Sequence, residues 1–285
     1  MTRALPLTAL CIALVLAGCG APVADTSTTA PRPTTAETSE PTTIETTTAP
    51  TPTTTDGTAA PADADYPPGV TAEGVENASR LLDAHEASVA AQGAHAVAQT
   101  TIDGVVRGEA FGLVSQSVVR FAPNGTRVYW TNAGVNSIGN ETSVQDTRYY
   151  ANETAVATRV VQRGNATVRE RNRSDLYDRV LRNAATQRRL LQSALANADY
   201  AVAGAEERNG TTVTTLVAEN GTYDGDQPVT AFDATLELSE SGRVLSVTRT
   251  RTLRTDASVE HHRTTVTWRP VALPVSPPAW TPWRQ

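Results

Sequence analysis

The stretch FDATLELSESGRVLSVTRTRTLR, residues 232–254, decides the fold of this chain. Every second residue from Phe232 to Leu238 is apolar, and the residues between them are polar. This period of two predicts a β-strand with one buried face and one solvated face. Glu240-Ser241-Gly242 then predicts a hairpin turn with Gly242 in a left-handed conformation. We therefore expect residues 243–254 to return as an antiparallel partner strand.

Two longer regions, 96–172 and 200–271, share the composition of this hairpin: both are rich in Val, Thr, Tyr and Arg and are interrupted by turn residues. They predict short strands joined as a meander. Two helices are expected beside them, over 67–92 with Thr71 as N-cap and over 174–198 with Ser174 as N-cap, and Gly93 ends the first. Their apolar stripes are Val75, Ala78, Leu82, His85 and Val89 in the first helix and Leu176, Val180, Ala184, Leu191 and Leu195 in the second.

The order helix, strands, helix, strands predicts an α+β fold with mostly antiparallel pairing. One curved antiparallel sheet, an open half-barrel wrapped around the two helices, would cover both apolar stripes. Trp280 and Trp283 lie in a Pro-rich tail that either folds back over the sheet or contacts a partner.

The N-terminus has the pattern of an export signal. One positive charge, Arg3, precedes an apolar run from Ala4 to Ala17, which is shorter than the roughly 20 residues of a membrane-spanning helix. Leu16-Ala17-Gly18-Cys19 matches the lipobox of bacterial and archaeal lipoprotein signals. That resemblance implies lipidation of Cys19 and cleavage before it, and the alternative is an ordinary signal peptide with a chance cysteine. We predict a signal peptide over 1–18 and a protein anchored by lipid in the cell membrane, facing the extracellular side.

The next segment, 19–66, is dominated by Thr, Pro, Ala and acidic residues, and such a composition cannot bury enough apolar surface to fold. We expect a disordered stalk, either a plain spacer or an O-glycosylated one, followed by a globular domain over 67–285. Seven acidic residues and only Arg32 lie between Gly20 and Tyr66, so the stalk carries −6, equal to the formal net charge of the chain. The domain is therefore nearly neutral, which argues against a nucleic-acid partner.

Eight Asn-X-Ser/Thr sequons lie in the domain. They predict exposed positions that can carry N-glycans in an exported protein. The Asn-Gly pairs among them also suit hairpin turns, so turn chemistry is a second explanation that can hold together with the first. The eight asparagines are Asn77, Asn124, Asn140, Asn152, Asn165, Asn172, Asn209 and Asn220.

The sequence contains no recognisable catalytic motif. No nucleophile elbow, phosphate-binding loop or metal-ligand spacing is present, and we expect no metal and no cofactor. His261 and His262 are adjacent on a strand, so they point to opposite faces and do not share a metal simply. Arg249 and Arg251 share a strand face, and a solvated face is expected there more than an anion or glycan site. The same expectation holds for Arg169, Arg171 and Arg173.

The helix, meander, inserted helix and hairpins such as ATLELSESGRVLSVTRTRT resemble the superfamily of LolA-like lipoprotein carriers and mycobacterial lipid-transfer lipoproteins. The motif at Leu16–Cys19, the Thr/Pro stalk and the opening YPPGV at 66–70 resemble haloarchaeal surface lipoproteins of uncharacterised function. The first resemblance implies a half-barrel that holds a lipid or another apolar ligand between sheet and helices without catalysis. The alternatives are a structural or interaction module without a small ligand and, third, a hydrolase. The sequence points to no particular protein partner.

Overall fold

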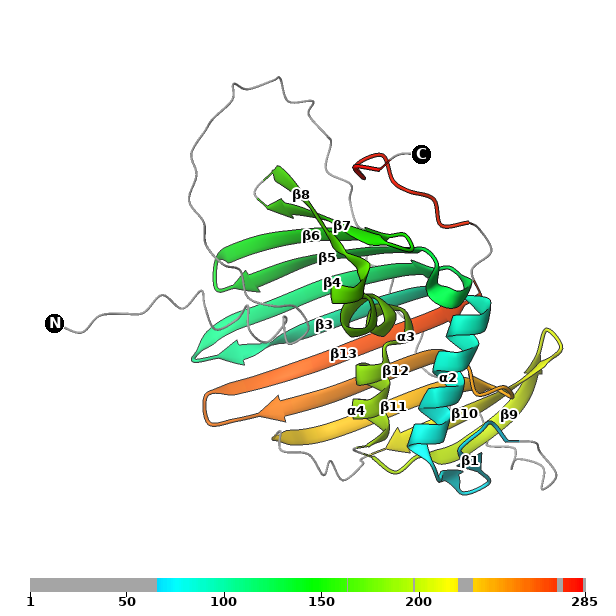
Figure 1. The fold of residues 1–285 in the computed structure, drawn as a ribbon. Coiled ribbons are helices and arrows are strands. Elements are labelled where there is room, and N and C mark those ends of the chain that lie inside the picture. The colour runs from blue at the N-terminus through cyan, green and yellow to red at the C-terminus, as the bar shows by residue number, and fades with distance from the viewer. Residues whose placement is uncertain (1–65, 163, 197, 220–227, 271–273, 284–285) are drawn as a thin grey trace, which may run out of the picture. The chain divides into compact units, whose positions relative to one another are not determined.

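The computed structural model describes residues 66–162, 164–196, 198–219, 228–270 and 274–283. Most of these residues form one antiparallel sheet of eleven strands in the order β8-β7-β6-β5-β4-β3-β13-β12-β11-β10-β9 (Figure 1). The sheet is curved and does not close, because β8 and β9 form its two edges. The predicted fold class is therefore confirmed. The signal segment, Cys19 and the stalk lie outside the described residues.

Nine of the ten strand pairings join strands that are consecutive in the chain, and the tenth, between β13 and β3, joins the two ends of the domain. The strands are β3 (Ala94–Val106), β4 (Glu109–Phe121), β5 (Val128–Ile138), β6 (Glu141–Ala151), β7 (Ala155–Gln162), β8 (Asn165–Asn172), β9 (Ala201–Arg208), β10 (Thr211–Glu219), β11 (Val229–Ser239), β12 (Val244–Arg254) and β13 (Ser258–Arg269).

The hairpin that decided the fold class has the predicted form. The four apolar residues of β11 from Phe232 to Leu238 are buried, and Gly242 in the following turn has a φ of 80°. β11 pairs with β12, and β12 pairs in turn with β13.

The first helix, α2 (Ala78–Gln92), begins later than the sequence suggested. Thr71 is not its N-cap: it lies in β1 (Val70–Thr71), which pairs with β2 (Gly74–Val75). Asn77 caps the helix instead, since its side-chain oxygen accepts a hydrogen bond from the Arg80 backbone at 2.9 Å. The early Thr-Ala-Glu pattern therefore belongs to a small hairpin, and Gly93 ends the helix as predicted.

The second helix is broken into pieces rather than continuous. A 3₁₀ turn η2 (Arg173–Asp175) contains Ser174, and the helical part then runs through the π-helical η3 (Tyr177–Arg182), α3 (Asn183–Thr186) and α4 (Arg188–Leu195). Ser174 is therefore not an N-cap. Gln187 has a φ of 51° and turns the chain between α3 and α4. The break lets both pieces pack on the sheet, and all five predicted stripe residues are buried.

The helices cover one face of the sheet, here called the inner face (Figure 1). Trp268 of β13 marks this face, because its indole N–H donates to the carbonyl of Ala185 at 2.8 Å. Alternation along each strand and cross-strand pairing assign the other strands to the same face. The opposite, outer face carries the C-terminal tail: Trp283 packs on Tyr150 with the ring centroids 5.8 Å apart. The tail thus folds back on the sheet.

Candidate functional site

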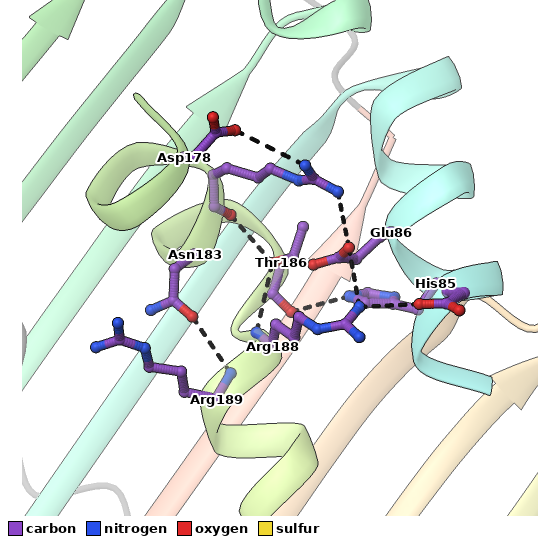
Figure 2. A network of polar contacts seen from close by, with 9 residues as sticks. His85, Glu86, Asp178, Asn183, Thr186, Arg188 and Arg189 are labelled. Carbon is purple, nitrogen blue, oxygen red and sulfur yellow. Dashed lines mark hydrogen bonds and ion pairs between the residues drawn. The ribbon is translucent and has the colours of Figure 1, made fainter. Parts of the chain in front are cut away.

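On the inner face, a polar network joins α2 to the second helical region (Figure 2). Arg188 contacts Asp83 at 3.1 Å and Glu86 at 3.0 Å, and Arg182 contacts Glu86 at 2.8 Å. Glu86, whose side chain is 13% exposed, therefore receives two guanidinium groups. Exposed ion pairs contribute little individually, but these three link helices that are separated by about a hundred residues in the sequence.

Beneath this network, His85 connects α2 to the second helical region and to the sheet. Its Nδ1 accepts a hydrogen bond from the Val244 backbone at 3.1 Å, so Nε2 carries the proton and donates to the Thr186 carbonyl at 3.0 Å. Burial lowers the pKa of His85 to about 4. The imidazole is neutral at pH 7 and acts as a structural bridge, and nothing about it suggests a ligand-binding role.

The space between the helices and the sheet is filled by the chain's own side chains. Leu81 of α2, Leu181 of η3, Leu191 of α4 and Leu236 of β11 have no exposed surface at all. A side chain beside a water-sized void would retain accessible surface, so these residues border no such void. Around these four side chains there is no room for a ligand. The part of the inner face that could bind one lies farther along the strands.

The strands continue beyond the helices, toward the hairpins at 107–108, 139–140 and 255–257 (Figure 1). Four polar side chains of β12 and β13, which begin at α4 and run onto this distal part of the inner face, form what we call the charged cluster: Arg249, Arg251, Glu260 and His262. Arg249 is 8% exposed and His262 is 9% exposed. The solvated face expected for Arg249 is therefore wrong, because α4 lies against it: its guanidinium donates to the Ser193 hydroxyl of α4 at 3.4 Å.

The charged cluster is connected by hydrogen bonds. His262 Nε2 lies 3.0 Å from a Glu260 carboxylate oxygen, and Arg251 Nη2 lies 3.5 Å from His262 Nδ1. Burial lowers the pKa of His262 more than the Glu260 hydrogen bond raises it, and both arginines lower it further. With His262 neutral, Nε2 donates to Glu260 and Nδ1 accepts from Arg251. The cluster then holds two positive charges and one negative charge.

Apolar side chains continue the same face across β3, β4 and β5. Ile102 pairs with His262 on one side and with Leu113 on the other, and Phe111 pairs with Ile138. We call these four the apolar patch: Ile102, Phe111, Leu113 and Ile138. Leu113 is buried and the other three are half-buried. The distal inner face thus places a cationic cluster directly beside hydrocarbon side chains, an arrangement that suits an amphiphilic molecule.

A cavity of about 160 Å³ is lined mainly by outer-face residues of β3, β11, β12 and β13, and its lining also includes Arg251 and His262 of the charged cluster. Asp103, His261 and Arg263 line it together with Asp233, and the ring of His261 is 3.1 Å from the Thr252 hydroxyl. His261 is exposed while His262 is buried, so the two point to opposite faces as expected. Among the described residues, no three His, Cys, Asp or Glu side chains are grouped so that they could hold a metal ion.

The sequons lie mainly at turns and strand ends. Asn124 and Asn209 adopt left-handed conformations next to glycines, as their turn chemistry predicted. Asn152 is half-buried, and its side-chain oxygen accepts hydrogen bonds from Thr154 and Ala155. Asn220 lies outside the described residues. The exposed asparagines are Asn77, Asn124, Asn140, Asn165, Asn172 and Asn209.

Two of the three arginines at 169, 171 and 173 lie on a solvated face, as expected. Arg169 and Arg171 are exposed on β8, an edge strand. Arg173 instead donates to the carbonyls of Gly125 and Asn152 and lies 4.0 Å from the centre of the Tyr177 ring. Sequence reasoning could not identify Arg173 as a structural residue because the carbonyls that it binds are distant in the sequence.

No family model matches the sequence, and no curated protein matches it. Among solved structures, the chain is similar to LprF from Mycobacterium bovis, with 12% identity, a TM-score of 0.33 and coverage of 73% of this chain and 98% of that one. It is also similar to a putative outer membrane lipoprotein-sorting protein domain from Vibrio parahaemolyticus, with 11% identity, a TM-score of 0.23 and coverage of 70% and 95%. A DUF1329 family protein from Desulfovibrio piger has 9% identity, a TM-score of 0.21 and coverage of 67% and 91%.

Proposed function

We propose that this protein is a non-enzymatic, lipid-anchored protein of the extracytoplasmic surface that binds an apolar or lipid ligand on its distal inner face. The observation that carries the proposal is the apolar patch. Its side chains lie on the same face as the helices but beyond their cover, where a half-buried Phe111 and Ile138 retain accessible surface. Burying such surface under a ligand is favourable by about 25 cal/mol per Å².

The anchor in this proposal is Cys19, and the stalk would hold the domain away from the membrane. No helix of the described residues has the length and hydrophobicity needed to cross a membrane. A lipid on Cys19 would supply the attachment, since two acyl chains on one cysteine are enough for stable anchoring. The stalk sequence then gives the domain access to ligands in the space outside the membrane.

Uptake of a neutral apolar probe, N-phenyl-1-naphthylamine, tests the ligand-binding claim. The full chain carrying Cys19→Ser is titrated with the probe, and fluorescence reports its transfer into an apolar site. We compare Leu113→Asp with Val114→Asp, because the two neighbours lie on opposite faces of β4 and Val114 is 59% exposed. Saturable uptake is expected in the parent and in Val114→Asp, with at least a roughly tenfold loss in Leu113→Asp.

Thermal unfolding of each variant separates loss of binding from loss of folding. If Leu113→Asp is unfolded, Ile102→Asp replaces it, since Ile102 is only half-buried and its substitution disturbs less packing. A folded parent chain that takes up no probe would contradict the proposal. Equal uptake by all variants would place binding elsewhere on the molecule.

A surface structural or interaction module is the second candidate function. The fully buried leucines between the helices and the sheet favour it, because no room for a small ligand is left beside them. A row of exposed valines on the outer face of β4, β5 and β6, formed by Val114, Val135 and Val144, also suits contact with another macromolecule. Crosslinking on intact cells that recovers a protein and no lipid would favour this alternative.

A further inference from the structure

We infer that the charged cluster binds the anionic head group of the ligand, so that the amphiphile carries a carboxylate or phosphate at one end of a long hydrocarbon chain. The inference rests on the proposed function and names the ligand class of the same site. It depends on how the arginines, the hydroxyl groups beside them and the apolar patch are arranged on the inner face.

Two arginines two residues apart on β12 point to the same face as the helices. Arg249 is 8% exposed, so an anion bound to it would be shielded from water and from salt. A guanidinium recognises carboxylate and phosphate through paired, charge-assisted hydrogen bonds, which are stronger than those between neutral groups. Glu260 offsets one of the two positive charges, and the cluster keeps an excess of one for an anion.

The hydroxyl groups next to Arg249 extend the polar site toward β3 and β4. Arg249 pairs with Thr264, Thr264 pairs with Thr100, and Thr100 pairs with Ser115. The Thr100 and Thr264 hydroxyls are 3.3 Å apart. Such hydroxyls can donate to the oxygens of an anion whose charge is met by Arg249. A head group at this position would have both a cation and neutral donors within one row of side chains.

The neighbouring row of paired side chains, which contains Arg251, changes from polar on β12 and β13 to apolar on β3 and β4. Phe232 pairs with Arg251, Arg251 with His262, His262 with Ile102, and Ile102 with Leu113. Paired residues on neighbouring strands have Cβ atoms about 5 Å apart. A hydrocarbon chain leaving a head group at the arginines therefore reaches the apolar patch within two strands. The order of side chains matches the order of groups in an acidic amphiphile.

Displacement of bound N-phenyl-1-naphthylamine by matched amphiphiles tests the inference on the full chain carrying Cys19→Ser. The competitors are oleate, oleyl phosphate and the neutral oleyl alcohol, which share one hydrocarbon chain. We expect either or both anions to displace the probe at a roughly tenfold lower concentration than the alcohol does. A preference between oleate and oleyl phosphate distinguishes a carboxylate from a phosphate head group.

The double variant Arg249→Gln/Arg251→Gln should lose the preference for anions while oleyl alcohol displaces the probe as before. The unchanged alcohol result shows that the apolar part of the site is still folded. The double variant Arg254→Gln/Arg263→Gln removes two exposed arginines and has the same net charge, so it should keep the preference. Direct binding of the anions to the parent and both variants, followed by intrinsic tryptophan fluorescence, gives a second readout.

Two results would overturn the inference while the proposed function stands. One is equal displacement by alcohol and anions in the parent chain, and the other is a preference that survives in Arg249→Gln/Arg251→Gln. If Arg249→Gln/Arg251→Gln no longer binds even oleyl alcohol, Arg249→Lys/Arg251→Lys replaces it, because lysine keeps the positive charge. This variant should bind both the alcohol and the anions. If it binds the alcohol but shows no preference for anions, the inference is also overturned. A parent chain that takes up neither probe nor competitor contradicts the proposed function itself.

Discussion

The imidazole of His85 meets the indole of Trp268 edge to face, with the ring centroids 5.1 Å apart and the planes at 79°. His85 comes from α2 and Trp268 from β13, so this contact joins the first helix to the centre of the sheet. Each ring also makes hydrogen bonds to the second helical region, His85 to Thr186 and Trp268 to Ala185. The contact therefore links three parts of the fold, and the neutral state of His85 is part of it.

Protonation of His85 should destabilise the protein in acid. Burial lowers its pKa from 6.5 to about 4 in the folded state, so between these values the unfolded chain binds more protons than the folded one. Stability is then fully present above pH 6.5 and is lost as the pH falls toward 4, by about 3 kcal/mol at pH 4. Urea unfolding measured from pH 8 to pH 4 checks this expectation.

The variant His85→Gln serves as the control, because glutamine can donate and accept but does not titrate. It should be less stable than the parent at pH 7, and the difference between the two free energies of unfolding should shrink as the pH falls to 4. Parallel pH curves for the parent and the variant would show that His85 does not cause the acid sensitivity.

Arg173 should stabilise the two loops that its guanidinium contacts. It donates to the carbonyl oxygens of Gly125 and Asn152, and to that of Thr126 at 3.3 Å. Lysine lacks the planar fork needed to reach several carbonyls at once, so Arg173→Lys should cost about 1–3 kcal/mol. Hydrogen exchange should rise at 122–127 and 152–154, and Arg171→Lys on the exposed strand β8 should change neither quantity. Unchanged exchange in Arg173→Lys would refute the role assigned to this side chain.

At position 107, a residue that accepts a left-handed backbone should stabilise the hairpin between β3 and β4. Arg107 has a φ of 52° and precedes Gly108, which has a φ of 83°. Two such residues form a turn that favours Asn-Gly, so Arg107→Asn should raise the free energy of unfolding by up to about 1 kcal/mol. Arg107→Val, with a branched side chain, should lower it. A melting temperature that falls in Arg107→Asn would contradict this reading of the turn.

Membrane attachment should depend on Cys19 and not on Cys11. We predict that Cys19→Ser moves the protein from the membrane fraction to the soluble fraction of its host, because the thiol that carries the lipid is gone. Cys11→Ser should keep the protein on the membrane, since in this proposal residue 11 leaves with the signal peptide. Mass spectrometry of the mature N-terminus gives the added lipid mass. Equal membrane attachment of both variants would rule out the lipid anchor.

The sheet could be predicted because the sequence patterns that indicate its strands and turns lie within short stretches of the chain. Alternation from Phe232 to Leu238 and the glycine turn at Gly242 are properties of neighbouring residues, and both appear in the structure as expected. The stripe of the second helical region was correct, and so were Leu82, His85 and Val89 of the first, since periodicity records which side chains face the core; Val75 was wrong, because it lies in β2 and not in the helix. The start of the first helix was wrong: Asn77 rather than Thr71 is the cap, because residues 70–75 form a small hairpin.

The candidate site could not be predicted because it depends on contacts between distant segments. The sequence predicts a solvated strand face at Arg249, and this side chain is buried only because α4 packs over it. The turn at Gln187 positions α4, but residue 187 is neither a glycine nor a proline, so the sequence does not predict a turn there. The strand alternation did place Arg249 and Arg251 on one face, but their neighbours Ile102 and Leu113 are known only from the pairing of β13 with β3 and of β3 with β4.

Native mass spectrometry of the full chain, released from the membranes of its host before and after extraction with organic solvent, shows whether the protein carries a bound ligand. We predict an extra mass on the protein that extraction removes and that fragments as a long-chain amphiphile with an acidic group. The same measurement on Leu113→Asp should show little of this mass, and Val114→Asp should retain it. A folded parent chain that carries no extractable mass, and gains none when incubated with oleate or oleyl phosphate, would contradict ligand binding on the distal inner face.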